Sequence, residues 1–204
     1  METKTHWEKV YGTKDSTDVI WFQEHPELSL HCIDRTGVDN SAQVIDVGGG
    51  ASTLVDDLLS RNYQNITVLD ISAAALRVAQ ERLGSQANAV TWLEADITQV
   101  QLPYQFYDVW HDRAVFHFLT RAADRQKYVE AVMHSVKAGG HVIIATFGMD
   151  GPSRCSGLEV VRYDPDSLHH EFGSNFDLVH STSESHETPF GTEQRFIYCY
   201  YRKV

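Results

Sequence analysis

The sequence predicts an α/β fold in which helices cover a mostly parallel sheet. From residue 44 onward, apolar runs of strand length alternate with amphipathic stretches of helix length, a pattern typical of βαβ units. The first apolar run ends at an acid and is followed by three consecutive glycines, which predicts a tight turn into a helix. The last two apolar runs have a turn signal between them instead of a helix, so we expect an antiparallel hairpin.

The N-terminal part of the chain, residues 1–40, is rich in aromatic side chains. Two short helices are expected there, over residues 5–11 and from residue 26 to about 36. Trp7 and Tyr11 are four residues apart, and a helix would place both rings on one face. Packing against the core would explain these rings equally well.

The glycine stretch VIDVGGGAS, residues 44–52, bears most directly on function. Gly48, Gly49 and Gly50 lack the Cβ atoms that would keep a ligand away from the backbone. The free N–H groups of the following helix favour an anionic or strongly polar ligand. Dinucleotide-binding folds use Gly-x-Gly-x-x-Gly, whereas Thr53 stands in place of the last glycine here. A glycine-rich turn without a ligand is the alternative interpretation.

The alternating pattern assigns the remaining elements in chain order. Strands are expected over residues 44–47, 66–70, 90–95, 107–111 and 141–147. Helices are expected over residues 52–61, 73–83 and 123–136, where apolar residues recur at helical spacing. The last third should contain a loop rich in Gly, Ser and Pro, a short helix and two strands, over residues 148–157, 165–172, 176–184 and 195–201, with the hairpin turn at 189–191.

Length and composition narrow the class further. A chain of 204 residues with a formal net charge of −11 should form one domain, and it lacks the clustered Lys and Arg of nucleic-acid binders. Its three cysteines are widely spaced and its histidines show no metal-binding spacing, so we expect free thiols and no metal site. No apolar stretch approaches the roughly 20 residues of a membrane helix. We therefore expect no membrane contact and a cytoplasmic location.

Acids stand at the ends of the expected parallel strands. They are Asp46, Asp70, Asp96 and Asp112, and open α/β sheets bind ligands at the edge where the carboxyl ends of parallel strands meet. Asp70, about 20 residues beyond the glycines, is placed to accept both hydroxyls of a ribose. Asp96 offers a carboxylate to an adenine amino group, with Ile97 as an apolar wall. Each acid could instead cap the helix that follows it.

These motifs resemble the class I S-adenosylmethionine (SAM) methyltransferases, over nearly the whole chain. The resemblance rests on Asp-x-Gly-x-Gly at residues 46–50, Asp70-Ile71, Asp96-Ile97 and Gly139-Gly140. It implies a Rossmann-like three-layer sandwich whose seven-stranded, mostly parallel sheet has an antiparallel last strand beside the fifth. It also implies the cofactor S-adenosyl-L-methionine and the product S-adenosyl-L-homocysteine.

The opening of the chain is similar to one subgroup of that family, the protein-lysine methyltransferases that act on elongation factor 1A. The similar residues are Trp7, Tyr11, Trp21 and Phe22, and in that subgroup the matching aromatics help to enclose SAM. The subgroup has Asp-Lys-Gly after the fourth strand. This chain has HDRA at residues 111–114, which preserves the acid and a positive charge.

The candidate site residues form three groups. The cofactor candidates, carried by the motifs and the resemblance, are Trp7, Tyr11, Trp21, Asp46, Gly48, Gly49, Gly50, Asp70, Ile71, Asp96, Ile97, Asp112 and Arg113. The substrate candidates, most of them from the loop that should overhang the same edge, are Phe22, Arg154, Cys155 and Tyr163. The catalytic candidates for proton transfer are His111 and His117, because histidine changes charge near neutral pH. Either histidine could instead be structural.

The sequence therefore predicts one methyltransferase domain over residues 1–204. It comprises a helical lid at residues 1–40, a SAM-binding core at 41–147, and a substrate-side loop with a C-terminal hairpin at 148–204. The predicted function is methyl transfer from SAM to a small molecule, because an aromatic N-terminal segment could close over a compact pocket. A protein lysine is the alternative acceptor, and a SAM-binding module without catalysis is a further alternative. The acceptor atom and the oligomeric state stay open.

Overall fold

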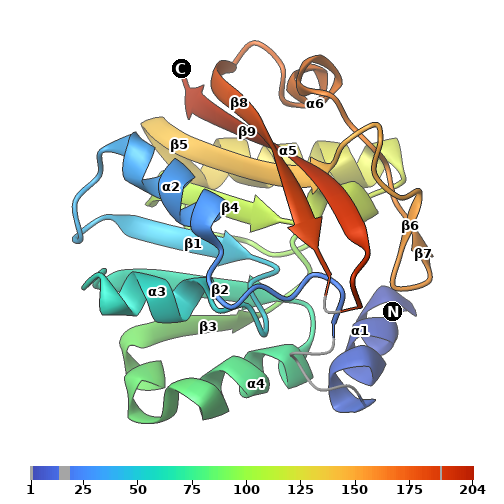
Figure 1. The fold of residues 1–204 in the computed structure, drawn as a ribbon. Helices are drawn as coiled ribbons and strands as arrows, with labels where there is room; N and C mark the ends of the chain where they lie inside the picture. Colours follow the sequence, from blue (N-terminus) through green and yellow to red (C-terminus); the bar gives the residue numbers. More distant parts are fainter. Residues whose placement is uncertain (1, 14–18, 189) are drawn as a thin grey trace.

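The structure, a computed structural model, describes residues 2–13, 19–188 and 190–204. Its centre is a seven-stranded sheet in the order β3-β2-β1-β4-β5-β9-β8 (Figure 1). The strands are β1 (Gln43–Val47), β2 (Asn65–Asp70), β3 (Val90–Glu94), β4 (Tyr107–Arg113), β5 (Val136–Phe147), β8 (Phe176–Glu187) and β9 (Glu193–Lys203).

The pairing of the strands confirms the expected sheet. Strands β1 to β5 pair in parallel, and β9 lies antiparallel between β5 and β8. The predicted hairpin is formed by β8 and β9. Of its predicted turn, residue 189 lies outside the described residues, while Gly191 has φ 74° and donates its N–H to the Thr188 carbonyl at 2.9 Å.

Helices cover both faces of the sheet and complete a three-layer α/β sandwich (Figure 1). Leucines of α2 (Glu27–Thr36), α3 (Leu54–Ser60) and α4 (Ala73–Leu83) join the core on one face. Side chains of α5 (Ala122–Ser135) and α6 (Pro165–Phe172) join the core on the other. The first helix, α1 (Glu2–Thr13), packs against α4. Helix α1 therefore lies at the edge of the sheet where the parallel strands end.

Three features of the fold differ from the sequence-based expectation. Strand β5 begins at Val136, directly after α5, because Val136 is fully buried and pairs with Tyr107. The two glycines at 139 and 140 lie inside this strand, where the register with β4 shifts. Two short 3₁₀ helices, η2 (Gly84–Ala89) and η3 (Phe116–Phe118), and a small ribbon of β6 (Arg154–Cys155) and β7 (Leu158–Glu159) were not expected.

The described residues contain neither a membrane-spanning helix nor a metal-binding cluster. No helix among them has the length and apolar character needed to cross a membrane. No group of three or more His, Cys, Asp or Glu side chains in the same part of the chain is arranged to hold a metal ion.

Candidate functional site

The glycine loop after β1 brings the backbone against the end of β2. Gly48 has φ 72°, and a Cβ there would overlap the side chain of Val115. A Cβ on Gly50 would lie 2.5 Å from Oδ2 of Asp70 and 2.8 Å from Cβ of Ala75. Glycine is therefore required at both positions, for backbone conformation at the first and for close approach at the second.

Asp70 ends β2 directly opposite this loop. The residue is 6 % exposed, and its Oδ1 accepts the N–H of Ser72 at 2.8 Å. Burial raises the pKa of Asp70 to about 7, and the Ser72 N–H and the Asp46 carboxylate act on it in opposite directions. Ile71, the next residue, is half-buried. Asp70 thus presents a carboxylate at the carboxyl edge that is ionised only near or above neutral pH.

Helix α1 is attached beside Asp70 through Glu8. The Glu8 carboxylate accepts the N–H of Ala73 at 2.6 Å and the N–H of Ala74 at 3.3 Å. These N–H groups lie at the start of α4 and have no acceptor within the helix itself. Lys4 forms an ion pair with Glu94 at the end of β3. The helix expected to act as a lid therefore lies over the carboxyl edge.

The predicted N-terminal aromatics form one cluster with a ring from η3. We define the aromatic cluster as Trp7, Tyr11, Trp21 and Phe118. The centroid of the Trp7 ring lies 5.5 Å from Trp21 and 5.2 Å from Phe118, and Nε1 of Trp21 donates to the Tyr11 hydroxyl at 3.1 Å. Residues from α1, the following segment and η3 thus meet above the sheet edge.

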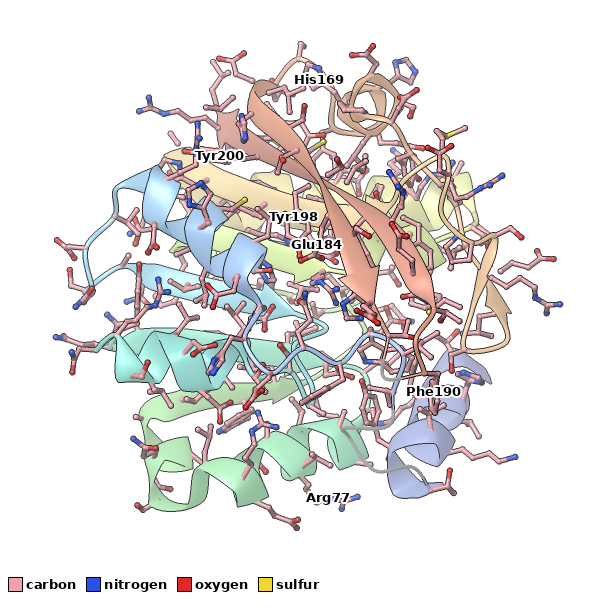
Figure 2. All side chains as sticks on the ribbon, in the orientation of Figure 1. Arg77, His169, Glu184, Phe190, Tyr198 and Tyr200 are labelled. Atoms are coloured by element: carbon pink, nitrogen blue, oxygen red, sulfur yellow. The ribbon has the colours of Figure 1, made fainter. Side chains whose placement is uncertain are left out.

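Arg113, at the end of β4, connects the hairpin to the segment that carries Trp21. Its guanidinium donates to the Tyr198 hydroxyl at 3.0 Å and to the Trp21 carbonyl at 3.1 Å. It also lies 3.3 Å from Glu184 and stacks over the Phe196 ring at 4.4 Å. Glu184 and Tyr198 lie close together on the hairpin (Figure 2). In this structure Arg113 holds the N-terminal segment in place.

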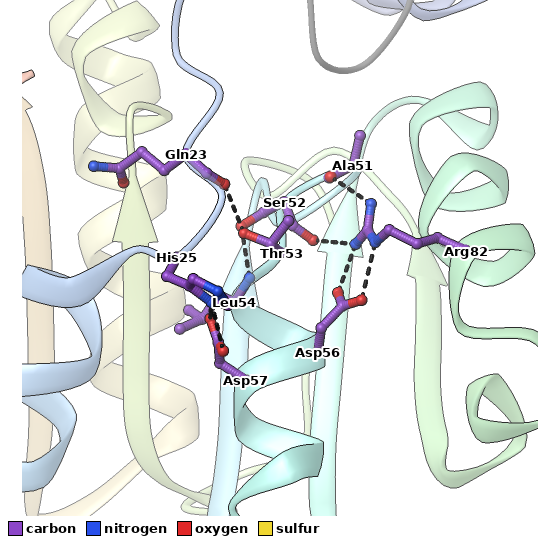
Figure 3. Close-up of polar contacts among 9 residues, drawn as sticks. All are labelled: Gln23, His25, Ala51, Ser52, Thr53, Leu54, Asp56, Asp57 and Arg82. Atoms are coloured by element: carbon purple, nitrogen blue, oxygen red, sulfur yellow. Dashed lines mark hydrogen bonds and ion pairs between the residues drawn. The ribbon is translucent and has the colours of Figure 1, made fainter. Parts of the chain in front are cut away.

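A second set of contacts fixes the residues that follow the glycines (Figure 3). Arg82 of α4 donates to the carbonyls of Ala51 and Ser52 at 3.0 and 2.7 Å and forms an ion pair with Asp56. Thr53 donates its hydroxyl to the Gln23 carbonyl at 2.8 Å. The loop is therefore held from α4 on one side and from the N-terminal segment on the other.

Asp46 and His111 face the same side of the sheet and bond to one another. Nδ1 of His111 lies 2.7 Å from Oδ1 of Asp46, and Nε2 lies 2.9 Å from Oγ of Ser29 on α2. The other carboxylate oxygen, Oδ2 of Asp46, is buried and has no hydrogen-bond partner among the described residues. The site therefore contains one buried carboxylate oxygen, Oδ2 of Asp46, that could still accept a hydrogen bond.

A cavity of about 50 Å³ lies between the glycine loop and the N-terminal segment. Its lining includes Trp21, Phe22, Asp46, His111 and Arg113, together with Gly48, Gly49, Tyr11 and Ser29. Pockets for cofactor-sized ligands measure roughly 300–1,000 Å³. The cavity is thus too small for such a ligand while the N-terminal segment lies in this position.

Two of the predicted acids, Asp96 and Asp112, accept hydrogen bonds from nearby residues of the protein. Asp96 accepts the N–H and hydroxyl of Thr98 at 2.9 and 2.7 Å and the amide of Gln99 at 2.8 Å. Asp112 is fully buried and faces α5, where it accepts the Tyr128 hydroxyl at 2.5 Å. Burial raises the pKa of Asp112 to about 7. Ile97 is buried in the core cluster beneath α5. The structure therefore gives these side chains local, structural contacts.

The substrate candidates other than Phe22 lie outside the cavity lining. Cys155 and Tyr163 are each 3 % exposed and belong to the two core clusters, and burial raises the pKa of the Cys155 thiol to about 12. Arg154 is exposed and donates to the Gly157 carbonyl at 2.8 Å. The structure gives these three residues packing or loop contacts.

His117 is buried beside the aromatic cluster. Its Nδ1 accepts the N–H of Phe147 at 3.2 Å, while Nε2 has no partner among the described residues. Burial lowers the pKa of His117 to about 3. The ring is therefore neutral at physiological pH, with its proton on Nε2.

The cavity region fits the groups that SAM carries. Asp70 would offer an acceptor for ribose hydroxyls beside the glycine loop, and the free Oδ2 of Asp46 would accept from an ammonium group. Sequence reasoning missed Glu8, Ser29, Arg82, Glu184 and Tyr198, because no local pattern marks residues whose partners lie far away in the sequence.

Comparison with known proteins agrees with this geometry. Residues 44–140 match the model of a methyltransferase domain. The chain is 29 % identical over 110 residues to the eEF1A lysine and N-terminal methyltransferase of Mus musculus, covering 53 % of this chain and 15 % of that protein. It is 20 % identical over 193 residues to the EEF1A lysine methyltransferase 2 of Homo sapiens, covering 88 % and 76 %. It is 32 % identical over 117 residues to the ubiquinone biosynthesis O-methyltransferase of Serratia proteamaculans, covering 57 % and 47 %.

Solved structures share the whole fold at low identity. A SAM-dependent methyltransferase from Anabaena variabilis superposes with a TM-score of 0.78 at 14 % identity, covering 100 % of this chain and 96 % of that one. The 1,6-didemethyltoxoflavin-N1-methyltransferase of Burkholderia thailandensis superposes with a TM-score of 0.71 at 16 % identity, covering 100 % and 85 %. With the match of residues 44–140 to a methyltransferase domain and the order of the sheet, these similarities show that the chain contains a methyltransferase domain and has the fold of SAM-dependent methyltransferases.

Proposed function

We propose that the protein transfers a methyl group from SAM to a small-molecule acceptor. The observation that carries this proposal is the aromatic cluster, which closes over the carboxyl edge beside Asp70 and the glycine loop. Such a cover favours an acceptor that can be fully enclosed, because transfer benefits from alignment and from the exclusion of water. The bound cofactor would supply the activated methyl group.

The chain's own residues have distinct proposed roles in holding the cofactor. Asp70 would accept hydrogen bonds from the ribose, and the loop at Gly48 to Gly50 would receive the amino-acid end beside Asp46. Trp7, Tyr11 and Trp21 would cover the cofactor and keep water out. Because the cavity measures about 50 Å³, this segment would move outward when the cofactor enters.

A protein lysine is the second candidate acceptor. It is supported by relatives named as lysine methyltransferases of eEF1A, one of which matches along 88 % of this chain. The net charge of −11 would also attract a basic protein. A SAM-binding module without catalysis is a further candidate, since Asp46, Gly48 and Gly49 line the cavity and residues that hold the cofactor would serve binding alone as well as catalysis.

Transfer of labelled methyl groups tests these alternatives directly. The purified chain is incubated with methyl-labelled SAM and cell extract, and the products are separated by size. Label in the small-molecule fraction is the expected result, and label in protein would support the lysine alternative. Absence of transfer to either fraction, in a protein that binds SAM, would contradict catalysis. The Asp70→Ala variant serves as the matched control for label carried over without the cofactor site.

A further inference from the structure

A buried hydrogen-bond chain runs from the glycine loop through the sheet to α2 and β9. The side chains of Asp46 and His111 are each 3 % exposed and lie 2.7 Å apart. Ser29 is fully buried, 2.9 Å from Nε2 of His111 and 3.4 Å from the Tyr198 hydroxyl. Each of these residues comes from a different element, so the chain joins β1, β4, α2 and β9.

The carboxylate partner of Nδ1 assigns one proton position in this chain. An ionised carboxylate can only accept hydrogen bonds, so Nδ1 of His111 carries the proton that lies toward Oδ1 of Asp46. In a neutral ring the other nitrogen is then an acceptor. In that tautomer Nε2 accepts the hydroxyl proton of Ser29. The two contacts fix the orientation of the His111 ring.

The consequence for Asp46 is that one oxygen is held and the other is left free. Oδ1 is bonded to His111, while Oδ2 is buried, unpartnered and adjacent to Gly49. Asp46, Gly49, His111 and Ser29 all line the cavity. A buried, unpaired carboxylate oxygen is costly. A cationic donor that reached this cavity would remove that cost.

We infer that His111, supported by Ser29, is a positioning residue that holds Asp46 with Oδ2 ready for the ammonium group at the amino-acid end of the cofactor. This inference rests on the proposed function. His111 does not touch the methyl acceptor in this account. His111 affects cofactor affinity through Asp46. It affects only the contribution that the amino-acid end of the cofactor makes to that affinity.

Two ligands and two variants test this inference. S-adenosylhomocysteine carries the ammonium group, whereas 5′-methylthioadenosine has the same adenosine and sulfur without the amino-acid end. His111→Leu removes the donor to Asp46, and His111→Asn keeps an N–H near the position of Nδ1. Affinities of both ligands are measured by calorimetry on the full chain, with thermal melting of each variant as the check on folding.

The expected result is a ligand-specific loss. His111→Leu should weaken S-adenosylhomocysteine binding by about tenfold or more, the size of a lost charge-assisted bond, and change 5′-methylthioadenosine binding by less than about threefold. His111→Asn should recover most of the affinity. In the unmodified protein, ¹⁵N spectra should show a protonated Nδ1 and an unprotonated Nε2.

The contrary results are equally specific. Equal weakening of both ligands by His111→Leu, or unchanged binding of both, would overturn the inference while leaving SAM binding intact. Failure of His111→Asn to recover affinity in a folded protein would also count against it. Failure of the unmodified protein to bind S-adenosylhomocysteine at all would instead contradict the proposed function itself.

Discussion

Asp70 and Asp46 are the two carboxylates beside the glycine loop, and their surroundings give them different properties. Asp70 accepts a backbone N–H at the start of α4, and burial raises its pKa to about 7. Asp46 instead bonds a histidine and keeps one oxygen free. The first carboxylate would therefore respond to pH in the neutral range, where its charge-assisted hydrogen bonds to a ligand would form or be lost.

Replacement of Asp70 by alanine should weaken S-adenosylhomocysteine binding by about 10- to 150-fold, because one charge-assisted bond contributes about 1.5–3 kcal/mol. In the unmodified protein the affinity should rise as pH increases from 6 to 8, since Asp70 ionises in that range. Calorimetric titrations at several pH values measure both effects.

The Asp70→Ala variant should also lose most of this pH dependence. Its melting temperature provides the control for folding, because an acid at the sheet edge is not part of the apolar core. Unchanged cofactor affinity in the folded variant would remove Asp70 from the site.

His117 should make the stability of the protein depend on pH. Burial lowers its pKa from 6.5 to about 3, so below pH 6.5 the unfolded chain binds a proton that the folded chain does not. The stability is fully present above pH 6.5 and is lost as pH falls, by about 1.4 kcal/mol per pH unit from this group. Denaturant unfolding between pH 6.5 and 4.5 measures the slope.

The control for this prediction is His117→Asn, whose side-chain oxygen can accept the Phe147 N–H but does not titrate. Its stability should fall less steeply with decreasing pH than that of the unmodified protein, whatever its absolute value. Parallel slopes for the two proteins would show that His117 is protonated in the folded state.

At the scale of elements, α1 has a different status from the other helices. Helices α2 to α6 pack against the sheet through the two core clusters, whereas α1 is attached at the carboxyl edge through Glu8 and the aromatic cluster. The exposed ion pair of Lys4 with Glu94 is screened by solvent and contributes little to the attachment. The aromatic rings and the Glu8 cap therefore provide most of the attachment.

Deletion of residues 1–24 should leave a folded protein that binds S-adenosylhomocysteine much more weakly and transfers no methyl group. The physical reason is that the sheet and its covering helices are complete without this segment, whereas the cavity loses Tyr11, Trp21 and Phe22 from its wall. Circular dichroism, calorimetry and the labelled transfer assay measure the three properties.

The substitution Glu8→Ala weakens the attachment of α1 while keeping its aromatic rings in the chain. Glu8→Ala should release α1 from α4 and increase cleavage by protease within the N-terminal segment, while Lys4→Ala should change it little. Normal binding and turnover by the truncated protein would contradict the lid, and the aromatics would then be no more than a satellite of the core.

At the scale of the whole molecule, the sequence predicts the architecture well because its signals are local. Strand ends, glycines and helix caps are adjacent in sequence, as with Ser72, which accepts the Ala75 N–H at the start of α4. The sequence does not predict the extra length of β5, because Gly139 suggests a break before the strand. In the structure β5 continues through Gly139, and its register with β4 shifts there.

The site was predictable only in part, for a geometric reason. Side chains alternate between the two faces of a strand, so the neighbours His111 and Asp112 diverge, one toward α2 and the other toward α5. An acid at the end of a strand in the sequence does not show which face of the sheet its side chain lies on. Contacts such as that of Ser29 with His111 span 82 positions, and no spacing rule in one sequence indicates them. The cytoplasmic location and the absence of a nucleic-acid partner stay predictions.

We propose that the carboxyl edge of this sheet binds SAM through the glycine loop and Asp70. Calorimetric titration of the full chain with S-adenosylhomocysteine, and separately with NAD, measures this binding. We expect saturable binding of S-adenosylhomocysteine that is weakened in Asp70→Ala, and no binding of NAD. Tight binding of NAD with no binding of SAM or S-adenosylhomocysteine would contradict it.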